Sequence, residues 1–371
     1  MRLGMFMMPL HPVGRALHDV IDEDYTKALL LDELGFNELW VGEHFSAVSE
    51  PLPSPLMFMA SLVNQTKNLT FAPGVLNLPN RHPAVIAAEL AQFDHMSKGR
   101  LIFGAGTGSL GSDFQLFRVP DEKVRQRMLI ESLDMIQKIW SQDPPYNFKG
   151  EFWTIDIDKS VNRDIGFGFM PKPYRSPRPD IVIPAASANS STIRLGAARG
   201  YLPLTSGLID QSLVGNHWKM FQEGRLEYGK PAEGRDWRVV RSVFVAGSDA
   251  EARARLHDKR SSFAHFFHHM HTVLSGLGRL AALKSDPAMP DSDLTIESMI
   301  DARVIYGSPD TVAAKLAALR AQAGPFGTLL ISGMDWSGPN AEWERESLTL
   351  LAKDVAPRLR AAAPQAERAL A

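Results

Sequence analysis

Two titratable side chains stand next to each other where a short apolar segment ends. Residues 39–41 (LWV) are apolar, Gly42 follows them, and Glu43 and His44 come directly after it. A histidine changes its charge near neutral pH, which suits it to proton transfer. The alternative is that glycine and polar residues only end a buried strand. The place of that strand in the fold decides between the two.

Two further segments have the composition of anion-binding sites. The segment GAGTGSLG at 104–111 is rich in glycine, which lets backbone N–H groups approach a ligand closely. A serine-rich turn precedes a predicted helix, and its hydroxyls and the helix N-terminus together favour a phosphate. The turn contains Ser187, Ser190 and Ser191. Arg127 or Arg125 could add a charged fork. Taken singly, each motif is better explained by a tight turn or a helix cap, and only their combination in a barrel favours an anion site.

Short apolar segments alternate with helix-length segments along the whole chain. Strands that are apolar on both faces and separated by helices are typical of a parallel sheet. We expect strands at 3–8, 38–41, 69–75, 100–103, 180–184, 201–205, 237–246 and 327–332. The main helices are expected at 56–63, 84–96, 121–140, 190–198, 211–228, 310–319 and 341–355. These units predict an α/β fold, a (β/α)8 TIM barrel with insertions, whose chemistry lies at the carboxyl ends of its strands. A doubly wound open sheet is the alternative.

Because the alternation continues to the last segment, a single domain is expected over residues 1–371. Two insertions are expected, at about 141–179 and 260–303, where the periodicity fades. The second contains HFFHHMH, which places His265 and His269 at helical i, i+4 spacing. No acidic partner lies nearby on that face, so we expect a polar helix face or a lid and no metal site.

Composition excludes several classes of protein. The chain has 371 residues, 44% of them hydrophobic and 22% charged, which is enough to bury a full core. A net charge of −2 gives no basic surface for nucleic acid, and the absence of cysteine excludes disulfides and thiolate metal sites. The apolar stretch at the N-terminus is too short to span a membrane. We expect a soluble, cytoplasmic protein with no nucleic-acid partner and no membrane contact.

Four motifs, in order, resemble the bacterial luciferase-type flavin monooxygenases. They are GEHF from Gly42, VLNLPNRHP from Val75, DHMSKGRLIFGAG from Asp94 and SDFQLF from Ser112. Their order and spacing agree over about residues 1–140, and a weaker match continues to the last helix. The N-terminal RLGMFMMPLHPVGR is similar to proteins of the limonene-type monooxygenase branch.

The resemblance implies a luciferase-like barrel that binds reduced FMN, which a separate flavin reductase supplies. Oxygen adds at the flavin C4a position, and the resulting peroxide attacks a small hydrophobic organic substrate. A homodimer is also implied. One alternative is a deazaflavin-dependent oxidoreductase of the same fold, although its glycine loop continues into an Asn-Glu pair that GTGSLGSD lacks. Another alternative is a non-enzymatic flavin-binding relative.

The same resemblance assigns roles to individual residues. His44 falls on the active-site histidine of the family, and Gly74-Val75 falls where the family has a non-prolyl cis peptide facing the flavin. Thr107 stands where luciferase has an arginine near the phosphate, so Arg127 is expected to carry the phosphate charge. The full set of expected cofactor-binding residues is Gly74, Val75, Asn77, Gly106, Thr107, Arg127, Ser187, Ser190 and Ser191. Expected substrate contacts are Met8, Phe45 and Trp336.

Overall fold

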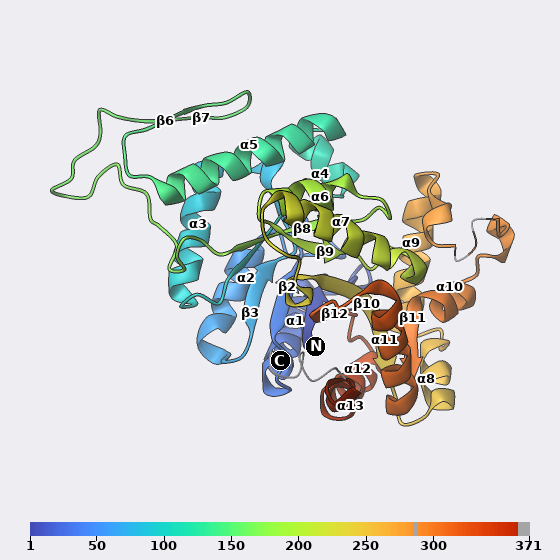
Figure 1. Ribbon diagram of the computed structural model, residues 1–371. Helices are drawn as coiled ribbons and strands as arrows, with labels where there is room; N and C mark the ends of the chain where they lie inside the picture. Colours follow the sequence, from blue (N-terminus) through green and yellow to red (C-terminus); the bar gives the residue numbers. More distant parts are fainter. Residues whose placement is uncertain (285, 287, 363–371) are drawn as a thin grey trace. The chain divides into compact units, whose positions relative to one another are not determined.

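The computed structural model describes residues 1–284, 286 and 288–362 (Figure 1). The chain forms two units. One comprises Met1–Leu39 and the described residues from Ile183 onward, and the other comprises Trp40–Val182. The expectation of a single domain over 1–371 stays a prediction. Among the described residues, no helix is both long enough and apolar enough to cross a membrane.

The first unit is built on parallel strands. β1 (Arg2–Met7) pairs with β12 (Thr328–Ser332), which pairs with β10 (Arg238–Val245), and β10 also pairs with β9 (Leu202–Thr205). β11 (Val304–Gly307) adds to the other part of β10, again in parallel. The helices between them are α1 (Leu17–Glu33), α6 (Ser191–Ala198), α7 (Val214–Glu227), α8 (Asp249–Leu256), α9 (Ser262–Gly276), α10 (Ile296–Arg303), α11 (Pro309–Ala323), α12 (Asn340–Leu350) and α13 (Ala356–Ala362).

The second unit repeats this pattern on a smaller scale. β5 (Ile102–Gly106) pairs in parallel with β4 (Leu76–Asn77) and with the start of β8 (Asp180–Ala185). Its remaining strands are β2 (Glu38–Val41), β3 (Thr70–Pro73) and an antiparallel ribbon of β6 (Tyr146–Lys149) and β7 (Thr154–Ile157). Its helices are α2 (Pro55–Leu62), α3 (Pro83–Met96), α4 (Gly111–Leu116) and α5 (Glu122–Ser141). Figure 1 shows the ribbon in the long connection that follows α5.

The order of the strands confirms the predicted fold class. Hydrogen-bonded neighbours follow the order β3-β2-β1-β12-β10-β9-β8-β5-β4. A parallel bridge between Phe71 of β3 and Leu101 joins β3 to the start of β5, so the order closes on itself. Apart from the two-residue β4, the strands of this ring are those predicted from the alternation. Helices alternate with them as in a (β/α)8 barrel, except that β3 leads directly into β4.

Two features differ from the prediction made from the sequence. Neither β4 nor β11 was predicted, and β11 is a four-residue strand directly after the expected insertion at 260–303. The first glycines of GAGTGSLG were expected in a loop, but Gly104 and Gly106 belong to β5. A Cβ on Gly104 would collide with the carbonyl oxygen of Pro73, and one on Gly106 would lie 2.5 Å from Val75 Cγ2. These glycines therefore let β5 approach the backbone around Val75.

Candidate active site

His44 is held by a carboxylate a few residues along the chain. The side chain is buried, and its Nδ1 lies 2.7 Å from Oε2 of Glu50. Burial lowers the pKa of His44, but the hydrogen bond and the charge of Glu50 outweigh it, so the pKa is raised above its ordinary value. The Nδ1–H then donates to Glu50, which leaves Nε2 as the nitrogen that can act on a ligand.

A second carboxylate fixes the backbone next to His44. Asp113, on α4, is buried and accepts hydrogen bonds from the backbone N–H groups of Phe45 and Ser46 at 3.1 and 2.9 Å. It also accepts from the hydroxyl of Ser46. The loop after β2 therefore has little freedom, and His44 is positioned by two anions. Sequence patterns assigned no role to Glu50 or to Asp113, although Asp113 lies within the motif SDFQLF.

Glu43 links the exit of β2 to β4. Its Oε2 accepts from the backbone N–H of Asn77 at 2.8 Å, and the Asn77 side-chain amide donates to the Glu43 carbonyl oxygen at 3.0 Å. Burial raises the pKa of Glu43 to about 7, against the opposing effect of the Asn77 hydrogen bond and of Arg81, whose Nη1 lies 3.9 Å away. Glu43 is thus a buried group that connects two strand ends and exchanges a proton near neutral pH.

The predicted cofactor residues of this unit gather around the same strand ends. The Gly74-Val75 peptide bond is cis, and the Gly74 N–H donates to the carbonyl oxygen of Val41 at 2.6 Å. Val75 meets Gly106, and Asn77 pairs with that glycine across β4 and β5. Thr107 follows directly and is half-buried. The structure therefore brings these residues together with the end of β2, which carries His44.

The predicted serine turn lies in the other unit, at the start of α6. Ser190 is the N-cap of this helix, but its side chain makes no capping hydrogen bond. Ser187 and Ser191 are exposed, and the Ser187 carbonyl oxygen accepts from His217 Nε2 at 2.8 Å. A helix start without a side-chain cap leaves backbone N–H groups for an anion, and nearby hydroxyls add donors. This donor set suits a phosphate group.

Comparison with known proteins identifies the family. The family model described as luciferase-like monooxygenase matches residues 1–325. The chain belongs to the luciferase-like monooxygenases. It is 26% identical to 3,6-diketocamphane 1,6-monooxygenase of Pseudomonas putida over 97% of this chain and 98% of that protein. It is 28% identical to limonene 1,2-monooxygenase of Rhodococcus erythropolis over 95% of this chain and 85% of that protein.

A solved structure shows the same fold. The oxygenating constituent of the 3,6-diketocamphane monooxygenase of Pseudomonas putida, described as a type II Baeyer-Villiger monooxygenase in complex with FMN, superposes with a TM-score of 0.87. The two chains are 26% identical, and the match covers 97% of this chain and 98% of the other. The family resemblance and the barrel fold predicted from the sequence are therefore confirmed.

In this luciferase-like monooxygenase, the arginines expected near a phosphate have partners of their own. The exposed Arg127 binds Glu151 through Nε and Nη2 at 3.1 and 3.0 Å. Arg125 is buried, donates to the carbonyl oxygens of Val119 and Pro120, and lies 3.5 Å from the ring centre of Phe114. The role of Arg127 in phosphate binding stays a prediction, and it requires the ion pair with Glu151 to open.

The predicted substrate contacts have different surroundings. Phe45 is half-buried and packs edge-on against Phe117, with ring centres 4.9 Å apart. Met8 is also half-buried. Trp336 is buried, with the ammonium of Lys27 5.1 Å and the guanidinium of Arg345 4.4 Å from its ring. Trp336 is therefore held by cations, and its contact with a substrate stays a prediction.

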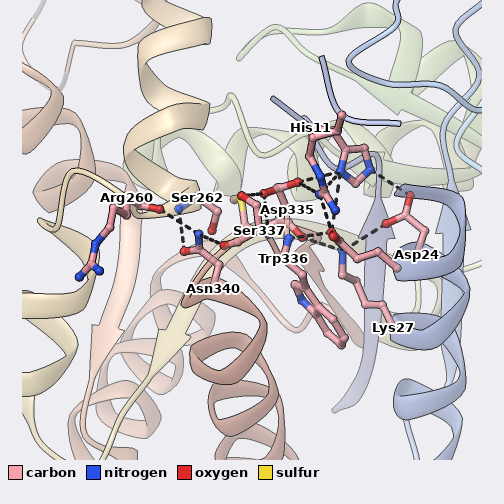
Figure 2. Close-up of polar contacts among 12 residues, drawn as sticks. His11, Asp24, Lys27, Arg260, Ser262, Asp335, Trp336, Ser337 and Asn340 are labelled. Atoms are coloured by element: carbon pink, nitrogen blue, oxygen red, sulfur yellow. Dashed lines mark hydrogen bonds and ion pairs between the residues drawn. The ribbon is translucent and has the colours of Figure 1, made fainter. Parts of the chain in front are cut away.

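The luciferase-like monooxygenase also carries a buried polar network that the sequence did not indicate (Figure 2). His11, just after β1, is 1% exposed and lies between Asp335 at 2.8 Å and Asp24 at 3.3 Å. Burial lowers the pKa of His11, but the two carboxylates together raise it to about 9. Lys27 donates to Asp24 at 3.2 Å and to the carbonyl oxygen of Met334 at 2.6 Å. The network ties β1, α1 and the exit of β12 together.

Atoms of His11, Glu23 and Asp24 lie within 4.8 Å of one another, as metal ligands would. However, Arg15 binds Glu23 at 2.7 Å and Lys27 binds Asp24 at 3.2 Å. Because these cations already balance the carboxylates, the cluster is explained as an ion-pair network without a metal.

The same network extends to the start of α9, which carries HFFHHMH. The Asn340 side chain accepts from the backbone N–H of Ser262 at 2.9 Å and donates to the carbonyl oxygens of Arg260 and Ser337 (Figure 2). Further along α9, His265 and His268 line an open cavity of about 310 Å³. The helix is thus anchored at its first turn.

Proposed function

We propose that this protein is the oxygenase component of a two-component FMN-dependent monooxygenase. In this proposal it receives reduced FMN from a separate reductase and transfers one oxygen atom of O2 to a small hydrophobic organic substrate. The observation that carries the proposal is His44, buried at the end of β2 and held by Glu50. The description of a structural relative as an oxygenating constituent in complex with FMN supports the two-component arrangement.

The residues present fit FMN. Ser190 and the uncapped start of α6 would hold the phosphate, with Ser187 and Ser191 as further donors. Gly74, Val75, Asn77, Gly106 and Thr107 would hold the flavin ring. When bound, reduced FMN supplies the electrons with which O2 is activated. Every other task falls to the protein: it orients the reactants, excludes water and handles protons.

His44 carries the proton chemistry in this proposal. Because Nδ1 is committed to Glu50, the imidazolium presents Nε2–H, from which it donates a hydrogen bond or a proton to an oxygen of the reacting group. Asp113 keeps the loop in place through Phe45 and Ser46. Apolar side chains, Met8, Phe45 and Trp336 among them, would contact the substrate and keep water out.

Anaerobic titration with two reduced cofactors tests the proposal. We expect the protein to bind reduced FMN, and to consume O2 when a flavin reductase, NADH and either limonene or 3,6-diketocamphane are added. Binding of a reduced deazaflavin without binding of reduced FMN would instead support the deazaflavin-dependent alternative. Binding of FMN with no O2 consumption above that of the reductase alone would support a non-enzymatic relative. A homodimer and a cytoplasmic location belong to the same proposal, and gel filtration with light scattering tests the first.

A further inference from the structure

Arg241 is a buried arginine whose charge is left without a partner. The side chain is only 2% exposed, in the middle of β10. Its Nη1 donates to the carbonyl oxygens of Val240 at 2.8 Å and Ser206 at 3.4 Å. Within the described part of the chain, Nε and Nη2 have no hydrogen-bond acceptor. A buried guanidinium without an anion is costly, so the environment of Arg241 needs an explanation.

The two nitrogens of Arg241 without an acceptor, Nε and Nη2, are the pair with which a guanidinium binds an oxyanion side-on. Nε–H and Nη2–H point the same way from one edge of a guanidinium and match the two oxygens of a carboxylate. The same strand provides the comparison. Arg238, three positions earlier, uses this edge to bind Glu38, with Nε and Nη2 at 2.8 and 3.0 Å from the two carboxylate oxygens. In Arg241 the equivalent edge is free.

A second arginine increases the local positive charge. β10 and β11 are in register from Ser242 opposite Val304, so Arg241 and Arg303 are the residues that directly precede this first pair. Arg303 is the last residue of α10, and its positive charge repels that of Arg241. Burial, and after it the charge of Arg303, lowers the pKa of Arg241 to about 10, which leaves it charged at neutral pH.

The neighbouring groups do not supply the missing anion. Arg303 donates mostly to backbone carbonyl oxygens, and its nearest carboxylate is that of Asp210, with Nη1 3.9 Å from Oδ2. The other oxygen of Asp210 accepts from Ser212. His217 donates from Nε2 to the Ser187 carbonyl oxygen, and its lowered pKa keeps it neutral. Arg241, which is buried, and Arg303, which is half-buried, thus share the carboxylate of Asp210, which leaves about one positive charge to be balanced.

We propose that Arg241 and Arg303 form a binding site for one small oxyanion, a carboxylate, sulfate or phosphate group held side-on by Nε and Nη2 of Arg241. The site lies beside the loop that follows β9, where Ser206 contacts Arg241 and the next residues, Gly207 and Leu208, are exposed. Neither arginine is among the residues assigned to FMN, and the site does not depend on the proposed function.

Calorimetric titration of FMN-loaded protein with sodium sulfate, and separately with sodium formate, tests this site. Prior saturation with FMN occupies any site on the protein that binds the phosphate of the cofactor. Sodium chloride keeps the ionic strength constant. We expect one oxyanion to bind per chain. Arg241→Met, which keeps the length and loses the charge, abolishes binding. Arg241→Lys, which keeps the charge and loses the fork, weakens it by about tenfold or more.

The control is Arg253→Gln, which removes an exposed arginine paired with Asp301 and leaves oxyanion binding unchanged. No binding to the unmodified protein, or equal binding to Arg241→Met, overturns the proposal. If Arg241→Met does not fold, equal binding to Arg241→Lys overturns it in the same way. If FMN itself does not bind, the titration is run on the FMN-free chain. The oxyanion affinities of the unmodified protein and of the Arg241 variants are then compared directly. Failure of FMN binding and failure of oxyanion binding are therefore distinguishable.

Discussion

His44 and Glu50 form a hydrogen-bonded pair, with Nδ1 and Oε2 2.7 Å apart, inside the loop that follows β2. The pair raises the pKa of the His44 imidazole and directs Nε2 away from the carboxylate. In Glu50→Gln the hydrogen bond can persist but the negative charge is lost, so the pKa of His44 falls. We expect kcat to decline at lower pH than in the unmodified protein. A pH profile of kcat checks this. Glu251→Gln, at a half-buried pair with Arg255, is the control, and an unmoved profile in Glu50→Gln contradicts the positioning role.

Removal of the imidazole should separate cofactor binding from turnover. We expect His44→Gln to bind FMN as the unmodified protein does, while product formation falls by about 10²–10⁴-fold, the usual contribution of a general acid or base. O2 consumption should then yield more hydrogen peroxide, because the oxygen is no longer delivered to the substrate. Product and peroxide are measured together, with His18→Gln, at an exposed histidine, as control. Unchanged coupling would remove His44 from the mechanism.

The close approach of β5 to Val75 makes Gly106 sensitive to the smallest side chain. In Gly106→Ala the new methyl group would meet Val75 Cγ2 at 2.5 Å, so the backbone around Gly74-Val75 must shift. We expect a loss of about 1–3 kcal/mol in the free energy of unfolding, measured with urea, together with weaker FMN binding. Gly111→Ala is the matched control, because nothing lies within 4 Å of its added Cβ. If both variants bind FMN equally well, the flavin does not depend on this segment.

His11 should make stability depend on alkaline pH. Its pKa rises from 6.5 in the unfolded chain to about 9 in the folded protein, so the folded state binds the proton more tightly. The resulting stabilisation is complete below pH 6.5 and is lost as the pH rises through about 9. It amounts to something on the order of 2–3 kcal/mol. We therefore expect the free energy of unfolding to fall between pH 7 and 10, and His11→Gln to show a clearly smaller fall. Equal slopes for the two proteins would falsify this role of His11.

Much of the fold follows from local patterns in the sequence. Short segments that are apolar on both faces, separated by helices, predicted the strands of the ring apart from β4, because one face packs in the barrel interior and the other against helices. Asp121 was predicted to start a helix, and its side chain accepts from Val124 N–H at the start of α5. His44 and the Gly74-Val75 segment were found because their motifs lie within a few residues of strand ends, where local sequence and function coincide.

The partners of these residues were decided by the tertiary structure alone. His11 and Asp335 are 324 positions apart in sequence, and no periodicity connects them. Arg241 and Arg303 become neighbours only because β11, a strand that was not predicted, pairs with β10. Even Glu50, close to His44 in the chain, sits in an irregular loop whose path depends on Asp113. The sequence by itself determined which segments are buried and where strands end. Packing between distant segments decided which charged side chains meet, because the two residues of an ion pair are not spaced at any regular interval along the sequence.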